Sequence, residues 1–301
     1  ENGGQVEIVG AGGRVARMLE LYGSHAPKAS HKEIPAPIGT IEQIGRSTVE
    51  LGRTFREVFR YLGALACALV GAVRHPGSVN WRDVIRLAEK TGADALPIVG
   101  MISFLTGVIL AYEGATQLAE LGATAFVPDL VAFSVTRELG PLLTAIIIAG
   151  RSGAAFAAEI GTMKVNEEID ALYTFGLNPY GFLVLPRVLA LVLVLPMLNI
   201  FADLVGLAGG LVVSIVALDS TTVAFLQEVQ NSIQFRDVGA GLLKSLAFGA
   251  AIAMISCERG LATRGGPEGV GKSTTSAVVA SIFQLIFLDA AFTYLLTVFG
   301  I

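Results

Sequence analysis

Charged residues are scarce in this chain. Only 15% of its 301 residues are Asp, Glu, Lys or Arg, whereas 53% are hydrophobic, and the mean hydropathy is +0.67. Soluble domains carry roughly a quarter charged residues, and disordered chains combine low hydrophobicity with high net charge. Both classes are therefore excluded, and the composition predicts an integral membrane protein.

Cysteine is also scarce. Cys67 and Cys257 both stand in apolar surroundings, so they provide neither a disulfide framework nor a metal-ligand spacing. The net charge of −4 gives no signature of nucleic-acid binding. We therefore expect no metal, no cofactor and no nucleic-acid partner.

The charges that are present divide the chain. Twelve of the 21 Lys and Arg residues lie before residue 93, and the rest are scattered over an apolar body. We expect a short fragment and linker at 1–37, interfacial helices at 38–92 and a transmembrane domain at 93–301. Apolar residues recur every three or four positions from Ile41 to Val73, but their purely apolar part is too short for a span of ~20 residues. An interfacial helix is favoured there over a core helix of a soluble domain, and a second short helix is expected from Asn80 to about Lys90.

Five long apolar stretches follow, at 94–117, 127–160, 182–217, 237–260 and 275–299. The loops with Lys or Arg alternate with loops that have none, so the positive-inside rule predicts five spans with the N-terminus inside and the C-terminus outside. The third stretch would be ~54 Å long as one helix. One tilted or kinked span is favoured over a hairpin, which would place the base-free loop 218–235 inside. The predicted fold class is all-α and integral to the membrane.

Small residues recur at every fourth position on two of these spans, and such rows let helices approach closely. We expect helix contacts there, or a dimer interface. The rows are Gly150, Ala154 and Ala158; Gly153, Ala157 and Gly161; and Ala202, Gly206, Gly210 and Ser214.

Three charged residues lie within predicted spans. Arg137 and Glu138 stand in the second span and Lys244 in the fourth. Each charge costs roughly 2.5–3.5 kcal/mol at the bilayer centre on insertion scales, so these residues should be paired and face protein or a wet cavity. Glu138 with Lys244 is the expected pair. It forms either a structural lock between two helices or, as we favour, part of a polar site in a substrate cavity.

Two cytoplasmic segments stand out. Residues 266–273 match the G-x-x-x-x-G-K-[ST] phosphate-binding pattern, but they connect two spans and no strand precedes them, so we interpret the match as coincidental. Residues 159–176 combine an apolar stripe with the acids Glu167, Glu168 and Asp170. A short amphipathic helix projecting into the cytoplasm is expected there, as a docking point for a motor subunit.

The stretch from Arg137 to Leu172 (RELGPLLTAIIIAGRSGAAFAAEIGTMKVNEEIDAL), together with EGVGKSTTSAVVA at 268–280, resembles the signature of MlaE-type ABC transporter permeases, membrane subunits of lipid transporters that work with MCE-domain proteins. Residues 6–23 are similar to the end of a STAS domain. The resemblance implies a homodimer whose lipid cavity is lined by Arg137, Glu138, Lys244 and Arg86. It also implies a separate ATPase that docks on residues 161–172. The expected docking residues are Gly161, Met163, Val165, Glu167, Glu168, Asp170 and Leu172.

The sequence thus predicts a non-enzymatic permease of the bacterial inner membrane that moves phospholipid to or from a periplasmic MCE-type protein. Its expected partners are a second copy, an ABC ATPase, an MCE-domain protein and a STAS-domain protein. Two alternatives stay open at this stage: a secondary transporter or channel that needs no ATPase, and an enzyme that hydrolyses ATP at Lys272.

Overall fold

The computed structural model describes Gly13, Arg56, residues 59–61, 63–72, 74, 75, 77 and 79–299. The similarity to a STAS domain at 6–23 and most of the predicted interfacial helix from Ile41 lie outside these residues. Contacts divide the chain into Glu1–Glu57 and Val58–Ile301, and only the second unit is described below.

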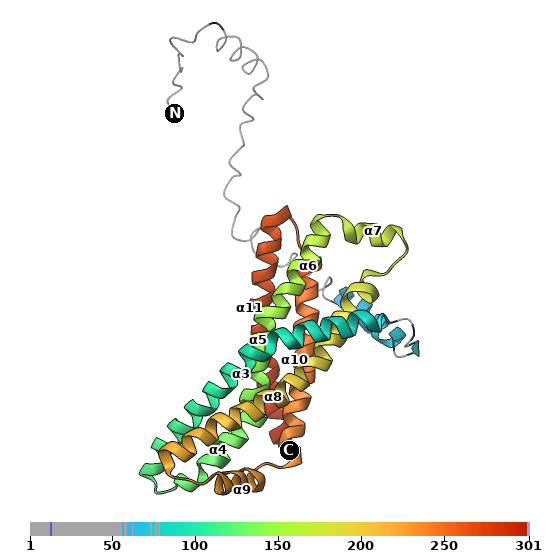
Figure 1. Ribbon diagram of the computed structural model, residues 1–301. Helices are drawn as coiled ribbons and strands as arrows, with labels where there is room; N and C mark the ends of the chain where they lie inside the picture. Colours follow the sequence, from blue (N-terminus) through green and yellow to red (C-terminus); the bar gives the residue numbers. More distant parts are fainter. Residues whose placement is uncertain are drawn as a thin grey trace, which may run out of the picture. The chain divides into compact units, whose positions relative to one another are not determined.

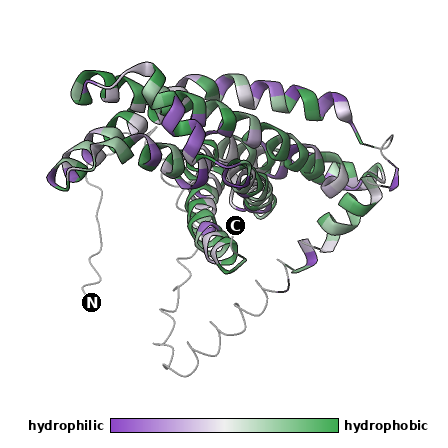
Figure 2. Ribbon diagram, turned by 90° about the horizontal axis from the view of Figure 1, so that it is seen from below, coloured by the Kyte–Doolittle hydropathy of each residue, from purple (hydrophilic) through white to green (hydrophobic). Residues whose placement is uncertain are grey.

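Every regular element in the described part is a helix (Figure 1). Five helical stretches are long and apolar enough to cross a membrane, so the predicted all-α membrane fold with five spans is confirmed. Figure 2 shows that hydrophobic residues cover most of their length. The stretches are Trp81–Glu120, Thr124–Val165, Tyr180–Leu218, Phe235–Leu261 and Gly266–Val298.

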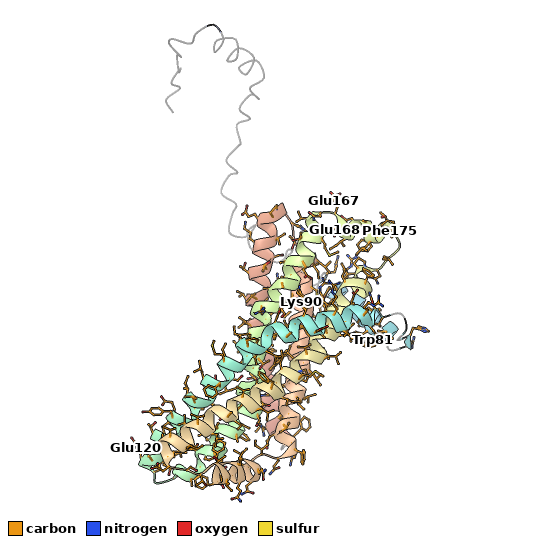
Figure 3. The ribbon with its side chains drawn as sticks, in the orientation of Figure 1. Trp81, Lys90, Glu120, Glu167, Glu168 and Phe175 are labelled. Atoms are coloured by element: carbon orange, nitrogen blue, oxygen red, sulfur yellow. The ribbon has the colours of Figure 1, made fainter. Side chains whose placement is uncertain are left out.

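The first span is the single helix α3 (Trp81–Glu120), so the prediction of a separate short helix ending near Lys90 is wrong. Asn80 precedes the helix but makes no side-chain bond to its backbone, and its amide nitrogen lies 2.5 Å from the Asp83 carboxylate instead. Pro97 stands inside α3, where its missing N–H and its ring favour a kink. Figure 3 shows the segment from Trp81 to Lys90 at an angle to the part that leads to Glu120.

The second span is broken into α4 (Val127–Ser134), α5 (Gly140–Ile148) and α6 (Ala154–Val165), joined by the π-helical turns η3 (Val135–Leu139) and η4 (Ala149–Gly153). The 3-10 turn η2 (Thr124–Phe126) precedes α4. A π turn inserts one extra residue into a helix and is frequent at functional sites. η3 carries both Arg137 and Glu138.

The third apolar stretch is one span, as predicted. A π turn, η5 (Tyr180–Val184), leads directly into α8 (Leu185–Leu218), which continues through Pro196 without a hairpin. The loop beyond α8 holds a short helix that the sequence analysis missed, α9 (Thr222–Ser232). Thr221 caps it by accepting a bond from the Ala224 backbone N–H at 3.3 Å.

The last two spans are α10 (Phe235–Leu261) and α11 (Gly266–Val298). The helical bundle has two distinct ends (Figure 1). We call them the α7 end, after the short helix α7 (Glu168–Thr174) that follows α6, and the α9 end. The predicted topology places the α7 end in the cytoplasm; its orientation in the membrane stays a prediction.

Small residues make the closest helix contacts. A Cβ on Gly107 of α3 would overlap the Gly206 carbonyl oxygen of α8, and a Cβ on Gly153 would lie 2.8 Å from Ser256 Oγ of α10. The rows that contain Gly206 and Gly153 are therefore helix contacts, as expected. Gly150 differs, because nothing lies within 4 Å of its Cβ position.

Candidate functional site: a buried lysine between two carboxylates

Lys244 lies in the interior of the bundle. Its side chain is 0% exposed, and its ammonium group lies 2.5 Å from Glu138 Oε2 and 3.0 Å from Asp289 Oδ1. It also donates to Thr293 Oγ1 at 3.0 Å. Asp289 and Thr293 are one turn apart on α11, so they present two oxygens on one face. We call Glu138, Lys244, Asp289 and Thr293 the Lys244 cluster.

The sequence analysis predicted the contact of Glu138 with Lys244, and the structure shows it. It did not identify Asp289 or Thr293. Thr293 Oγ1 lies 3.2 Å from Glu138 Oε2 and so closes the cluster. With one ammonium and two carboxylates, the cluster carries a formal charge of −1. The Glu138 side chain is 29% exposed, so the cluster is accessible on the Glu138 side.

Arg137 does not join this cluster, which corrects the expectation that all three charges meet. Its guanidinium lies 3.2 Å from Asp237 Oδ1, and its central carbon lies 5.2 Å from the centre of the Phe133 ring. Adjacent residues on a helix point about 100° apart. Arg137 therefore reaches the Asp237 carboxylate, while Glu138 points in another direction and reaches the Lys244 ammonium group. Asp237 and Lys244 stand seven residues apart on α10, which puts both on the face toward η3.

An apolar hollow lies beside Arg137. It has a volume of about 530 Å³ and lies on the α9 side of the Lys244 cluster. Phe133 lines it and also stacks against the Arg137 guanidinium, so the hollow and the Arg137–Asp237 pair are neighbours. The lining residues are Leu118, Phe126, Asp129, Leu130, Phe133, Ser134 and Ser232.

Arg86 is not brought to the cluster. It is exposed in the second turn of α3. Nearby Val84 packs with Leu185 at the start of α8, whereas Lys244 lies toward the opposite end of the bundle. The expectation that Arg86 lines the same cavity is therefore not supported within this single chain.

The predicted docking segment has a different shape from the one expected. α6 continues to Val165, the chain turns at Asn166 and Glu167, and the separate helix α7 begins at Glu168. Glu167 has a φ of 61°, a left-handed conformation that interrupts a helix. The expected short helix after the second span is therefore α7, but the predicted bounds 161–172 are wrong, because residues 161–165 belong to α6 and a turn separates the two helices.

The expected docking residues fall into two groups, one buried and one exposed. Gly161 is buried against Thr263, and Met163 and Leu172 pack on the core. The acids Glu167, Glu168 and Asp170 are exposed, with Asp170 paired to Lys164 at 2.9 Å, and Val165 is partly buried. Figure 3 shows Glu167, Glu168 and Phe175 together at the α7 end. Phe175, within the apolar stripe expected at 159–176, is 78% exposed.

The phosphate-binding pattern does not form a loop. Residues 266–273 are the first two turns of α11, and Lys272 is paired with Glu268 one turn earlier at 2.7 Å. A phosphate-binding loop needs a strand before it and free backbone N–H groups around the phosphate. The described part of the chain contains no strand.

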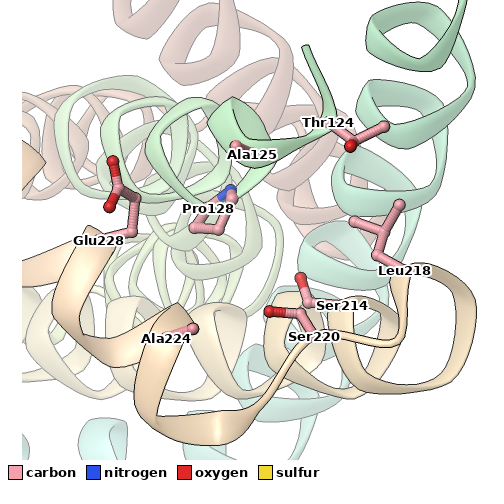
Figure 4. Close-up of a pocket in the computed structure, with 8 residues that line it drawn as sticks. All are labelled: Thr124, Ala125, Pro128, Ser214, Leu218, Ser220, Ala224 and Glu228. Carbon is pink, nitrogen blue, oxygen red and sulfur yellow. The ribbon is translucent and has the colours of Figure 1, made fainter. Parts of the chain in front are cut away.

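A second hollow of about 290 Å³ lies at the α9 end (Figure 4). Glu228 of α9 and Ser214 of α8 line it, together with Pro128 of α4. None of its lining residues belongs to the Lys244 cluster, so the two are separate features.

Comparison with known proteins agrees with this architecture. The family model described as "Permease MlaE" matches residues 84–295, which include the whole Lys244 cluster. A probable ABC transporter permease protein of Synechocystis is 42% identical over 220 residues, covering 73% of this chain and 84% of the relative. A probable ABC transporter permease protein of Rickettsia typhi is 41% identical over 213 residues, covering 71% of this chain and 82% of the relative.

A plant relative is also similar. The Arabidopsis thaliana protein TRIGALACTOSYLDIACYLGLYCEROL 1, chloroplastic, is 35% identical over 213 residues, covering 71% of this chain and 61% of that protein. The family match covers most of the chain and includes residues of all five spans. The chain therefore belongs to the MlaE permease family and is a multi-pass membrane protein of the ABC transporter permease type.

Proposed function

We propose that this permease moves phospholipid in the bacterial inner membrane and exchanges it with a periplasmic MCE-type protein. One relative carries the name of trigalactosyldiacylglycerol, a glycerolipid, which supports a lipid as cargo. The apolar hollow beside Phe133 suits acyl chains, and the adjacent charged groups suit a headgroup. The observation that carries the proposal is the Lys244 cluster, because ionisable residues within spans mark substrate pathways.

The energy for transport would come from a separate ATPase at the α7 end. Exposed acids and exposed apolar side chains lie close together there. Glu168 and Asp170 precede Tyr173 and Phe175, which are 55% and 78% exposed. Such a mixed surface fits a protein partner better than an anionic membrane surface, which would repel the acids. Because α6 runs without interruption from the turn before α7 to η4, movement at this surface would be transmitted into the second span.

A second copy of the chain would complete the cavity. α11 is the least buried of the five spans: only 11% of its most apolar window is buried inside one chain. Its outward side chains include Val279, Phe283 and Phe287, which are 64–74% exposed. This surface faces either acyl chains or the second copy, and Asp289 of the same helix reaches Lys244 behind it.

Purification of the chain with its ATPase, followed by mass spectrometry of bound lipid, tests the proposal. We expect a homodimer that retains glycerophospholipid and transfers it between vesicles only when ATP is hydrolysed. Transfer that proceeds without the ATPase would instead identify a secondary transporter or channel. Nucleotide binding by the isolated chain would indicate the third class, an ATP-hydrolysing enzyme.

A further inference from the structure

A second buried acid lies apart from the Lys244 cluster. Asp203 of α8 is 7% exposed, and Asn199, one turn earlier, is 1% exposed. The Asn199 amide nitrogen donates to Asp203 Oδ2 at 3.3 Å. Among the described residues no Lys or Arg forms an ion pair with Asp203, unlike the Glu138 and Asp289 carboxylates.

Two oxygens in this pair have no hydrogen-bond partner: Asp203 Oδ1 and Asn199 Oδ1. Both face the same small space beside Gly140, where a Cβ on that glycine would overlap Asp203 Oδ1 and lie 3.1 Å from Asn199 Oδ1. Acceptor oxygens that lie near the same small space without a proton repel each other, and each unsatisfied buried oxygen costs about 1–3 kcal/mol. One proton placed between them removes both penalties.

We propose that Asp203 is a proton-binding site. The neutral acid donates its O–H to Asn199 Oδ1 while the Asn199 amide donates to Asp203 Oδ2, which gives a reciprocal acid–amide pair. The proton comes from water and returns to water, and no bond between heavy atoms changes. A neutral acid also avoids the large cost of an unpaired carboxylate in the membrane interior.

The charged groups around this pair are already neutralised by one another. The junction of η3 with α5 and the helix α10 pack against it, through Gly140, the first residue of α5, and Gly241 on α10, whose Cβ position lies 3.5 Å from the Asn199 amide nitrogen. Of the charged residues on η3 and α10, Arg137 is paired with Asp237 and Glu138 with Lys244. α10 also carries the exposed Arg236 near its start and the Arg259–Glu258 pair near its end. The facing part of α3 has no Asp, Glu, Lys or Arg between Asp94 and Glu113. No cation in the described part of the chain is therefore paired with Asp203 to stabilise a carboxylate.

The proton site also lies where α8 meets the two segments that carry Glu138 and Lys244. Gly140 follows Glu138 by two residues, and Gly241 precedes Lys244 by three. The pair is protonated while α8 packs on these glycines. A movement of α8 away from η3 and α10 would admit water and allow the proton to leave.

Infrared difference spectroscopy of the purified homodimer tests the proposal. At neutral pH the wild-type protein should show the C=O stretch of a protonated carboxylic acid, and Asp203→Asn should remove it. Asp170→Asn, which changes an exposed acid at the α7 end, is the control and should leave the band unchanged. If Asp203→Asn removes no acid band, Asp203 is a carboxylate and the proposal is wrong.

A second variant tests the proposal independently of whether Asp203→Asn folds. Asn199→Leu keeps the acid and removes its partner, so the acid band should persist and move to the position of an acid without a hydrogen bond. An unmoved band would contradict the reciprocal pair. Thermal stabilisation of the wild-type protein by sodium chloride over choline chloride, lost in Asp203→Asn, would show a cation in place of the proton and would also overturn the proposal.

Discussion

Lys244 and Asp289 stand 45 positions apart in the sequence, on α10 and α11, and their charged groups lie 3.0 Å apart in the bundle interior. Glu138 approaches the same ammonium group from a third element, η3. One lysine therefore connects three helices that the chain brings together only on folding.

Asp289→Asn should weaken the fold less than Lys244→Met. The asparagine leaves the Lys244–Glu138 pair intact and removes the excess carboxylate, whereas the methionine leaves two buried carboxylates without a cation. Breaking a buried pair from one side costs about 3–5 kcal/mol. Thermal unfolding of the purified homodimer measures the difference. Equal unfolding temperatures for the two variants would contradict the charge assignment.

Arg137 and Asp237 should be energetically coupled. The single variants Arg137→Gln and Asp237→Asn each remove one partner of this ion pair, and the double variant removes both. Directly contacting residues show coupling energies of roughly 0.5–3 kcal/mol. A double-mutant cycle on thermal stability measures the coupling. Additive effects would show that the 3.2 Å contact does not stabilise the protein.

Gly107→Ala should separate α3 from α8. The new Cβ would overlap the Gly206 carbonyl oxygen, which belongs to the backbone and cannot rotate away. Overpacking of this kind costs typically 1–3 kcal/mol. Gly150→Ala is the matched control, because its Cβ would meet nothing within 4 Å. If both variants unfold at the same temperature, the predicted close contact of α3 with α8 is wrong.

Charge reversal at the α7 end should release the ATPase. The double variant Glu168→Lys with Asp170→Lys changes two exposed residues that support no core packing, so the permease should still fold. Co-purification of the ATPase should fall at least tenfold. Asp219→Lys, an exposed acid near the α9 end, is the control and should retain the ATPase. Loss of the ATPase from the control alone would place the docking surface at the other end.

The spans were predictable because length and hydropathy are local properties. The sequence also indicated that α8 is one helix, since the base-free loop 218–235 argued against a hairpin. Other features depend on contacts that no local pattern records. α9 was missed because it is only 11 residues long, although Phe225 and Val229 are buried against Ala132. The turn at Glu167 was missed because its left-handed backbone carries no glycine signal.

The charged site was predictable only in part. The contact of Glu138 with Lys244 followed from the cost of two opposite charges within the spans. Asp237 stands at the start of the fourth apolar stretch, where an acid passes for an interfacial residue. Asp289 lies near the middle of the fifth stretch and was not recognised as a partner of Lys244. Their inward direction depends on the rotation of α10 and α11, which packing alone sets. The extra residue of the π turn η3 changes the directions of the side chains that follow it, and Arg137 points toward Asp237, away from the cluster.

ATP-dependent transfer of fluorescent phospholipid by the reconstituted complex tests the central claim most directly. The comparison is Lys244→Met against Lys272→Met, which replaces an exposed lysine at the start of α11. The account predicts that Lys244→Met assembles with the ATPase but transfers lipid at least tenfold more slowly, while Lys272→Met transfers it at the wild-type rate. Wild-type transfer by a correctly assembled Lys244→Met complex would contradict the account.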